Sequence, residues 1–111
     1  MILGKEYYCY VIYSQSVDKY YIGYTADFEE RLKLHNSGYF GGKSYTHKAS
    51  DWKEFIRIKC RTIEMAIYFE SRIKRMKSRK FIEDLKTYPE IIEKLQREYH
   101  EKSGINDAPR A

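Results

Sequence analysis

Residues 7–38 read YYCYVIYSQSVDKYYIGYTADFEERLKLHNSG, and this stretch decides the fold. It holds two runs rich in aromatic and β-branched residues, 7–13 and 19–25, separated by a short polar segment. Such a pattern predicts an antiparallel hairpin. Thr25 or Asp27 can then cap a helix, because both side chains accept hydrogen bonds from backbone amides. A hairpin that leads directly into a helix is therefore predicted.

The remaining chain predicts one more strand and three more helices. The expected strand covers 52–61, and the expected helices cover 62–76, 79–86 and the residues from Pro89 to Ser103. A long loop, 39–50, precedes the strand. We expect an α+β fold with a small three-stranded sheet, the hairpin plus a third strand, packed with helices. The expected organisation is a domain at 1–86, a C-terminal helix at 87–102 packed on it, and a flexible tail at 103–111.

Length and composition fit a small globular domain. The chain has 111 residues, 42% of them hydrophobic and 33% charged, which allows one core and excludes a disordered chain. No apolar run is long enough to cross a bilayer, and the first residues lack the pattern of a signal peptide. We therefore expect a cytoplasmic protein without a membrane partner. Cys9 and Cys60 lie in apolar stretches and are expected to be buried free thiols.

The charge is unevenly distributed. The chain has 21 Lys and Arg against 16 Asp and Glu, a net charge of +5. Residues 72–80 contain six basic side chains and no acidic one. A solvated helix face explains such a run when it stands alone. Because this run follows directly on an apolar helix that carries Glu70, we interpret it as a surface that holds phosphates.

Two tyrosines, an arginine, a histidine and a later carboxylate are side chains of the kinds that a phosphodiester-cleaving site uses. Tyr10 and Tyr21 lie on neighbouring predicted strands and can meet across the hairpin. Arg31 and His35 are four residues apart and share one helix face. Glu70 supplies a carboxylate later in the chain. The alternative role for Glu70 is an ordinary ion pair with Lys74, four residues further along the helix.

This ordered set resembles the GIY-YIG nuclease superfamily over roughly residues 7–85. Residues 21–23 spell the second triplet, Tyr-Ile-Gly, and residues 8–10 stand where the first triplet would lie. The resemblance is greatest to small stand-alone members related to the N-terminal module of the bacterial excision-repair incision subunit. It implies a sheet packed with helices, a single divalent ion, Mg²⁺ or Mn²⁺, and hydrolysis of DNA, in repair, recombination or mobile-element processing. Tyr24 and Ile82 depart from the pattern, because many members carry lysine and some carry asparagine there.

The resemblance and the chemistry together suggest a role for each residue. Glu70 would hold the metal ion, and Tyr10 would accept a proton from water or orient it. Arg31 would clamp a phosphate oxygen, His35 would relay a proton, and Tyr21 would hydrogen-bond the phosphate or a metal-bound water. Gly23 would allow a close approach of backbone or substrate. Tyr13 is the alternative to Tyr10, because residues 11–13 spell Val-Ile-Tyr; the interval of eleven residues to Tyr21 favours Tyr10.

Phosphate contacts are expected from the loop and from the basic run. The residues chosen for this role are Lys43, Lys48, Lys74, Arg75 and Lys77. The favoured function is a metal-dependent DNA endonuclease, as a monomer or a weak dimer. The alternatives are a nucleic-acid-binding module that does not cleave, and a protein-interaction domain whose aromatic hairpin is only core. Convergence of the five predicted catalytic side chains on one cleft would favour the enzyme.

Overall fold

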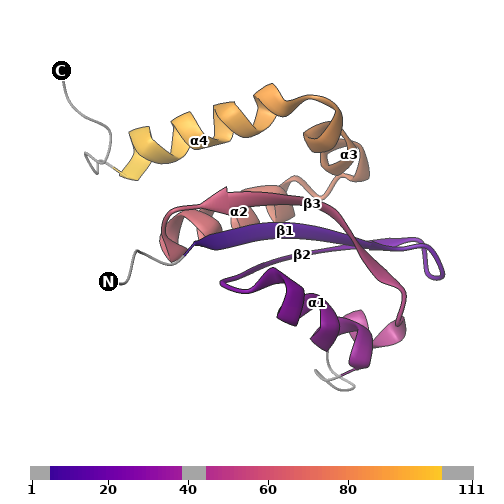
Figure 1. Ribbon diagram of the computed structural model, residues 1–111. Helices are drawn as coiled ribbons and strands as arrows, with labels where there is room; N and C mark the ends of the chain where they lie inside the picture. Colours follow the sequence, from indigo (N-terminus) through magenta and orange to yellow (C-terminus); the bar gives the residue numbers. More distant parts are fainter. Residues whose placement is uncertain (1–5, 39–44, 104–111) are drawn as a thin grey trace, which may run out of the picture. The chain divides into compact units, whose positions relative to one another are not determined.

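The structure, a computed structural model, describes residues 6–38 and 45–103. Its elements are β1 (Tyr7–Ser14), β2 (Lys19–Thr25), α1 (Phe28–Ser37), the 3₁₀ helix η1 (Tyr45–Lys48), β3 (Trp52–Cys60), α2 (Ile63–Met76), α3 (Arg79–Thr87) and α4 (Pro89–Ser103), as Figure 1 shows. The predicted α+β fold, with a hairpin, a third strand and a C-terminal helix, is confirmed. Within the predicted loop, residues 39–44 lie outside the described residues, and 45–48 form η1.

The chain divides into two compact units, Met1–Lys77 and Ser78–Ala111. The first unit holds the sheet with α1, η1 and α2, and the second holds α3 and α4, which contact each other. The division falls earlier than the predicted boundary after residue 86. The domain limits predicted from the sequence remain a prediction.

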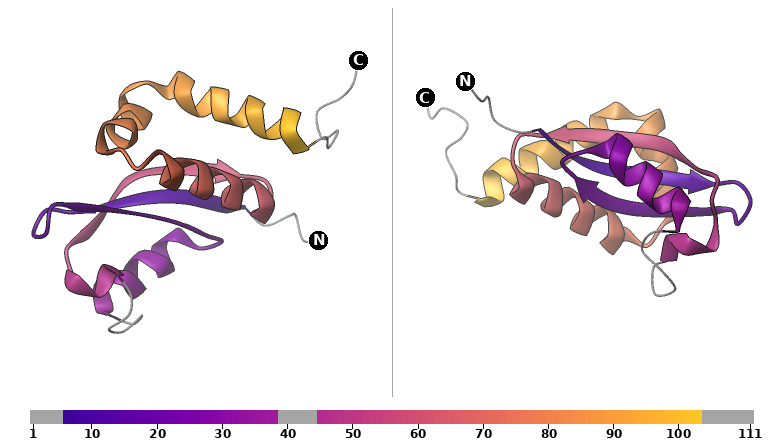
Figure 2. Two further views of the ribbon diagram at one scale, coloured as in Figure 1. Left: turned by 180° about the vertical axis from the view of Figure 1, so that it is seen from behind. Right: turned by 60° about the horizontal axis from the view of Figure 1, so that its bottom comes forward.

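The sheet is antiparallel in the order β2-β1-β3, so that β1 is central and β2 is an edge strand. Side chains alternate between the two faces of a strand. Tyr10 and Ile12 of β1 therefore point to one face, where they form a buried cluster with Phe28 and Trp52. The opposite face of β1 contacts α2, whose buried side chains include Phe69. Figures 1 and 2 show α1 and α2 on opposite sides of the sheet.

Local capping explains where the helices begin. Asp27 is the N-cap of α1 and accepts a hydrogen bond from the Glu30 amide at 3.1 Å. Thr25, the other predicted cap, instead accepts a hydrogen bond from the Asp27 amide through its hydroxyl, at 3.1 Å. Thr62 and Ser78 cap α2 and α3 in the same way. Both cysteines are buried free thiols, as predicted.

Candidate active site

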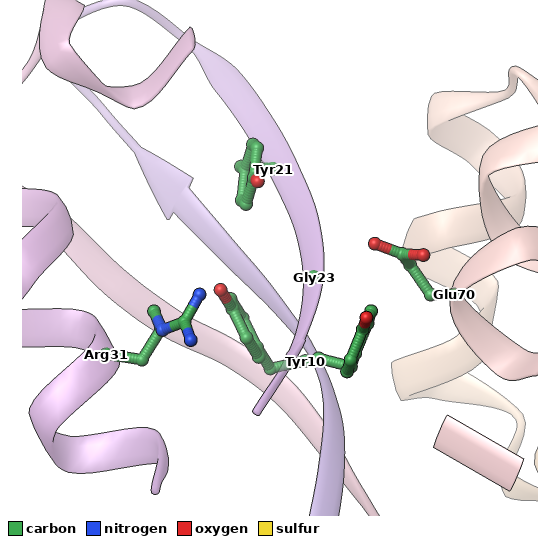
Figure 3. Close-up of a pocket in the computed structure, with 6 residues that line it drawn as sticks. Tyr10, Tyr21, Gly23, Arg31 and Glu70 are labelled. Atoms are coloured by element: carbon green, nitrogen blue, oxygen red, sulfur yellow. The ribbon is translucent and has the colours of Figure 1, made fainter. Parts of the chain in front are cut away.

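A pocket of about 220 Å³ lies at the edge of the sheet formed by β2. Its described lining comes from four elements, and consists of Tyr10, Tyr21, Gly23, Tyr24, Arg31 and Glu70. Because β2 is an edge strand, helices on opposite faces of the sheet can both contribute side chains there. Figure 3 shows Arg31 reaching toward the strands from α1, and Glu70 reaching toward them from α2. Four of the five side chains predicted to be catalytic therefore line one pocket.

The fifth predicted side chain, His35, lies directly behind the pocket. It is 2% exposed, and its Nε2 lies 2.8 Å from the hydroxyl oxygen of Tyr10. The ring centroids of His35 and Tyr21 are 5.0 Å apart. All five predicted residues thus lie in contact with the same pocket or with a residue that lines it.

Gly23 makes room for the Tyr10 ring. The two residues are directly opposite each other in the antiparallel pair of β1 and β2. A Cβ atom at position 23 would lie 2.6 Å from the Tyr10 hydroxyl oxygen and 2.7 Å from Cζ. Gly23 therefore leaves room for the phenol ring that crosses over it. The group that approaches the glycine closely is the Tyr10 side chain of the protein itself.

The hydrogen-bonded chain that begins at Tyr10 continues beyond His35. His35 Nδ1 lies 2.8 Å from Thr46 Oγ1 in η1. The backbone carbonyl of Thr46 accepts a hydrogen bond from Trp52 Nε1 at 2.9 Å. All four side chains are nearly inaccessible to solvent. The chain thus connects the pocket to the packed core on the same side of the sheet.

Burial disfavours the charged forms of both residues at the start of this chain. It raises the pKa of Tyr10 above its usual value near 10, with a further increase from Tyr21, whereas the charge of Arg31 acts to lower it. Burial, and then the charge of Arg31, lower the pKa of His35 from 6.5 to about 4. At neutral pH the pair is therefore a neutral phenol next to a neutral imidazole.

Glu70 is engaged by a cation of its own helix. The Lys74 ammonium lies 3.1 Å from Glu70 Oε2, and the two side chains are 50% and 17% exposed. Lys74 Nζ also lies 6.0 Å from the centroid of the Tyr21 ring. The ion pair between Glu70 and Lys74, which the sequence offered as the alternative to a metal-binding role, is therefore present. Glu70 also lines the pocket.

The residues at the pocket fit a hydrated Mg²⁺ or Mn²⁺ ion. Glu70 is the one carboxylate in the described lining, and the described residues hold no group of three His, Cys, Asp or Glu side chains suited to a metal. Mg²⁺ keeps several water ligands and often binds through one or two carboxylates. The pocket volume of about 220 Å³ exceeds the roughly 30 Å³ that one water occupies several-fold, so a partly hydrated ion can be accommodated.

The other predicted residues are distributed around the first unit. Lys48, Arg75 and Lys77 are exposed, and Lys43 lies outside the described residues. Tyr13, the alternative to Tyr10, belongs to the hairpin end, where its hydroxyl donates to Asp18 Oδ1 at 2.5 Å. It is not among the described residues that line the pocket.

Sequence reasoning missed two residues at this site. In the sequence Tyr24 stands out only as a departure from the lysine of other members, yet it lines the pocket. Thr46 belongs to the predicted loop, where no local pattern distinguishes it, because its partner His35 is eleven residues away. Ile82, the other departure, is 7% exposed on α3.

Comparison with protein families identifies the chain. The model of the GIY-YIG catalytic domain matches residues 6–83, and the chain therefore belongs to the GIY-YIG family, a family of nucleases. The resemblance stated from the sequence is confirmed. Comparison with curated proteins and comparison with solved structures gave no match. In the described part of the chain, no helix has the length and apolar character needed to cross a membrane.

Proposed function

We propose that this protein is a metal-dependent endonuclease that hydrolyses phosphodiester bonds in DNA. The observation that carries the proposal is the convergence of Tyr10, Tyr21, Arg31 and Glu70 on one pocket, with His35 hydrogen-bonded to Tyr10 behind it. Family membership supports the reaction class, and the net charge of +5 supports a polyanionic substrate.

Glu70 would hold Mg²⁺ or Mn²⁺ through its carboxylate. Bound there, the ion supplies positive charge that polarises the phosphate and stabilises the leaving oxygen. Lys74 would compete with the ion for Glu70, because its ammonium now lies 3.1 Å from Oε2 of the carboxylate. Once released, Lys74 is an exposed cation at the same place and can contact a phosphate oxygen of the substrate.

Tyr10 accepts a proton from the attacking water in the proposed reaction. Its own pKa is raised by burial, so the phenolate is not available at neutral pH. A neutral phenol can take a proton only while it gives one away. His35 is neutral at that pH, and its Nε2 lies 2.8 Å from the hydroxyl oxygen, within reach for this transfer. The two residues thus act as a relay.

Arg31 and Tyr21 hold the phosphate. A guanidinium stays charged at all relevant pH values and matches two phosphate oxygens with two parallel N–H groups. Arg31 reaches toward the pocket from α1, and Tyr21 lines it from β2. Their donors can therefore neutralise charge that develops on the non-bridging oxygens during attack.

A nicking assay on supercoiled plasmid and on branched DNA tests the proposal. Wild-type protein should cleave with Mg²⁺ or Mn²⁺ and lose activity with a chelator. Glu70→Gln should abolish cleavage and leave DNA binding nearly unchanged, because it removes the metal ligand and few phosphate contacts. Glu64→Gln is the matched control, since Glu64 is an exposed glutamate in the first turn of the same helix.

Each result of this assay has a definite meaning. Cleavage by Glu70→Gln at the wild-type rate would refute the role of Glu70. DNA binding without cleavage in either metal ion would identify the chain as the binding module that keeps the scaffold. An RNA duplex of the same sequence, assayed in parallel, tests whether DNA is the preferred substrate.

A further inference from the structure

Thr46 is held in a fixed position beside His35. Its residue is 1% exposed, and its Oγ1 lies 2.8 Å from His35 Nδ1. Its carbonyl oxygen accepts hydrogen bonds from Trp52 Nε1 at 2.9 Å and from the Ala49 amide at 3.3 Å. A β-branched side chain also has few rotamers available. The hydroxyl is therefore held in place by the backbone that carries it.

We propose that Thr46 is a positioning residue that accepts the Nδ1–H of His35 and thereby keeps Nε2 unprotonated toward Tyr10. The inference rests on the proposed nuclease function, because an unprotonated Nε2 is what the relay from Tyr10 requires. It assigns the proton on the histidine, which the positions of the ring atoms alone leave undetermined.

The chemistry of the two hydroxyl groups favours this assignment. A neutral imidazole carries one N–H, so one of its nitrogens donates and the other accepts. A phenol, with a pKa near 10, is the more acidic donor of the two hydroxyls. An aliphatic alcohol oxygen is the better acceptor, since the phenol oxygen shares its lone pairs with the ring. Both hydrogen bonds are best satisfied when Tyr10 donates to Nε2 and Thr46 accepts from Nδ1.

The opposite tautomer would change the chemistry of the site. With the proton on Nε2, His35 would donate to the Tyr10 oxygen, and Thr46 would donate to Nδ1. Tyr10 could then pass no proton to His35, and the imidazole would act only as a donor that favours a phenolate. The two assignments therefore predict different spectra and different effects of removing the Thr46 hydroxyl.

Nitrogen-15 NMR of the metal-free wild-type protein at pH 7 decides between them. Long-range correlations of a ¹⁵N-labelled histidine distinguish a protonated nitrogen from an unprotonated one. We expect His35 to show a protonated Nδ1 and an unprotonated Nε2. A protonated Nε2 in the wild type would overturn the proposal, and this measurement requires neither metal ion nor cleavage.

Three variants extend the test to function. Thr46→Val keeps the shape of the side chain and removes the acceptor, so His35 should shift toward the Nε2–H form and the cleavage rate constant should fall about 10- to 100-fold, as for other partners that orient a functional histidine. Thr46→Ser restores the hydroxyl and should recover the wild-type tautomer and rate. Ser14→Ala is the control, because it removes another buried hydroxyl, one that donates to Asp51 at 2.5 Å.

The readouts separate this inference from the proposed function. An Nδ1–H tautomer in a protein that cleaves nothing would refute the nuclease and leave the positioning by Thr46 standing. An active protein whose Thr46→Val variant keeps both tautomer and rate would refute the positioning role and leave the nuclease standing. If Thr46→Val does not fold, the wild-type spectrum and the comparison with Thr46→Ser still decide the question.

Discussion

Tyr10 lies across Gly23 so closely that the two positions act as one unit of the site. They pair directly in the β1–β2 ladder, and a Cβ at position 23 would lie 2.6 Å from the hydroxyl oxygen of Tyr10. Real Cβ atoms do not approach other atoms so closely, so any larger residue must displace the phenol. The same hydroxyl is 2.8 Å from His35 Nε2, and the displacement would therefore break that hydrogen bond.

Gly23→Ala should consequently reduce both stability and cleavage. Overpacking of this kind costs about 1–3 kcal/mol, and the loss of the Tyr10–His35 contact should lower the cleavage rate at least about 100-fold. Gly38→Ala is a matched control. Gly38 has φ of 74° at the end of α1 and open space around it, so alanine there costs roughly 1–2 kcal/mol through backbone strain alone. Urea unfolding should show losses of similar size, and only Gly23→Ala should affect nicking. Equal activity of the two variants would contradict this reading.

Most of the fold could be predicted from local patterns, because hairpin composition, caps and helical periodicity are short-range signals. The hairpin at residues 7–25 and the N-cap Asp27 illustrate this. Strand pairing predicts that Tyr10 meets Tyr21, and helical spacing predicts that Arg31 and His35 share a face. Only the resemblance to a family predicts that these pairs converge with Glu70.

Contacts between side chains that are far apart in the sequence could not be predicted from local patterns. The contact of Thr46 with His35 depends on how the segment between α1 and β3 folds back, and no periodicity encodes that. Burial of Tyr10 and His35, which raises one pKa and lowers the other, likewise depends on packing of the whole layer beneath α1. The resemblance predicts that Tyr10 and His35 belong to one site, whereas their protonation states depend on the tertiary packing that buries them.

Tyr10→Phe should reduce cleavage about 10²- to 10⁴-fold, because phenylalanine cannot relay a proton. Tyr13→Phe is the control. It removes an exposed hydroxyl that donates to Asp18 at the hairpin end and should leave the rate unchanged. Single-turnover cleavage with Mn²⁺ measures the chemical step of both variants. A larger loss in Tyr13→Phe would show that the register inferred for the catalytic tyrosine is wrong.

The lowered pKa of His35 predicts a loss of stability in mild acid. The pKa of His35 is about 4 in the folded state, against about 6.5 for an unperturbed histidine, so between these pH values the unfolded chain binds the proton that the native state excludes. Stability should therefore fall as pH drops from 7 through 6.5 toward 4, by about 2 kcal/mol between pH 7 and pH 5. His35→Gln should show a shallower dependence over this interval in urea titrations. Identical slopes for the two proteins would mean that His35 is not the responsible group.

Lys74 should compete with a divalent ion for Glu70, because its ammonium lies 3.1 Å from the carboxylate. Lys74→Met is expected to tighten Mn²⁺ binding up to about fivefold, the equivalent of about 1 kcal/mol for a half-exposed ion pair. Arg75→Met makes the same charge change one residue further along α2 and should have a smaller effect. Electron paramagnetic resonance of free Mn²⁺ measures both. An equal gain in Mn²⁺ affinity in both variants would show that net charge causes the gain, and would refute competition between Lys74 and the ion.

Arg75 and Lys77 should contact DNA phosphates without reading the sequence. Both are exposed, Arg75 in the last turn of α2 and Lys77 as its C-cap, and the helical rise puts the backbone of Lys77 about 10 Å along the axis from that of Glu70. Basic side chains also suit the C-terminal end of a helix, which is the purely structural explanation for them.

The salt dependence of binding distinguishes these explanations. Each lost duplex-phosphate contact should flatten the slope of log K against log salt by about 0.9, so Arg75→Gln with Lys77→Gln should flatten it by up to about 1.8. Lys33→Gln with Lys53→Gln changes the net charge equally at exposed positions of α1 and β3. We expect uniform weakening across DNA sequences in the first double variant and a nearly unchanged slope in the second. Equal slopes in wild type and both variants would place the DNA-binding surface elsewhere, and Lys48 in η1 would be the next residue to replace.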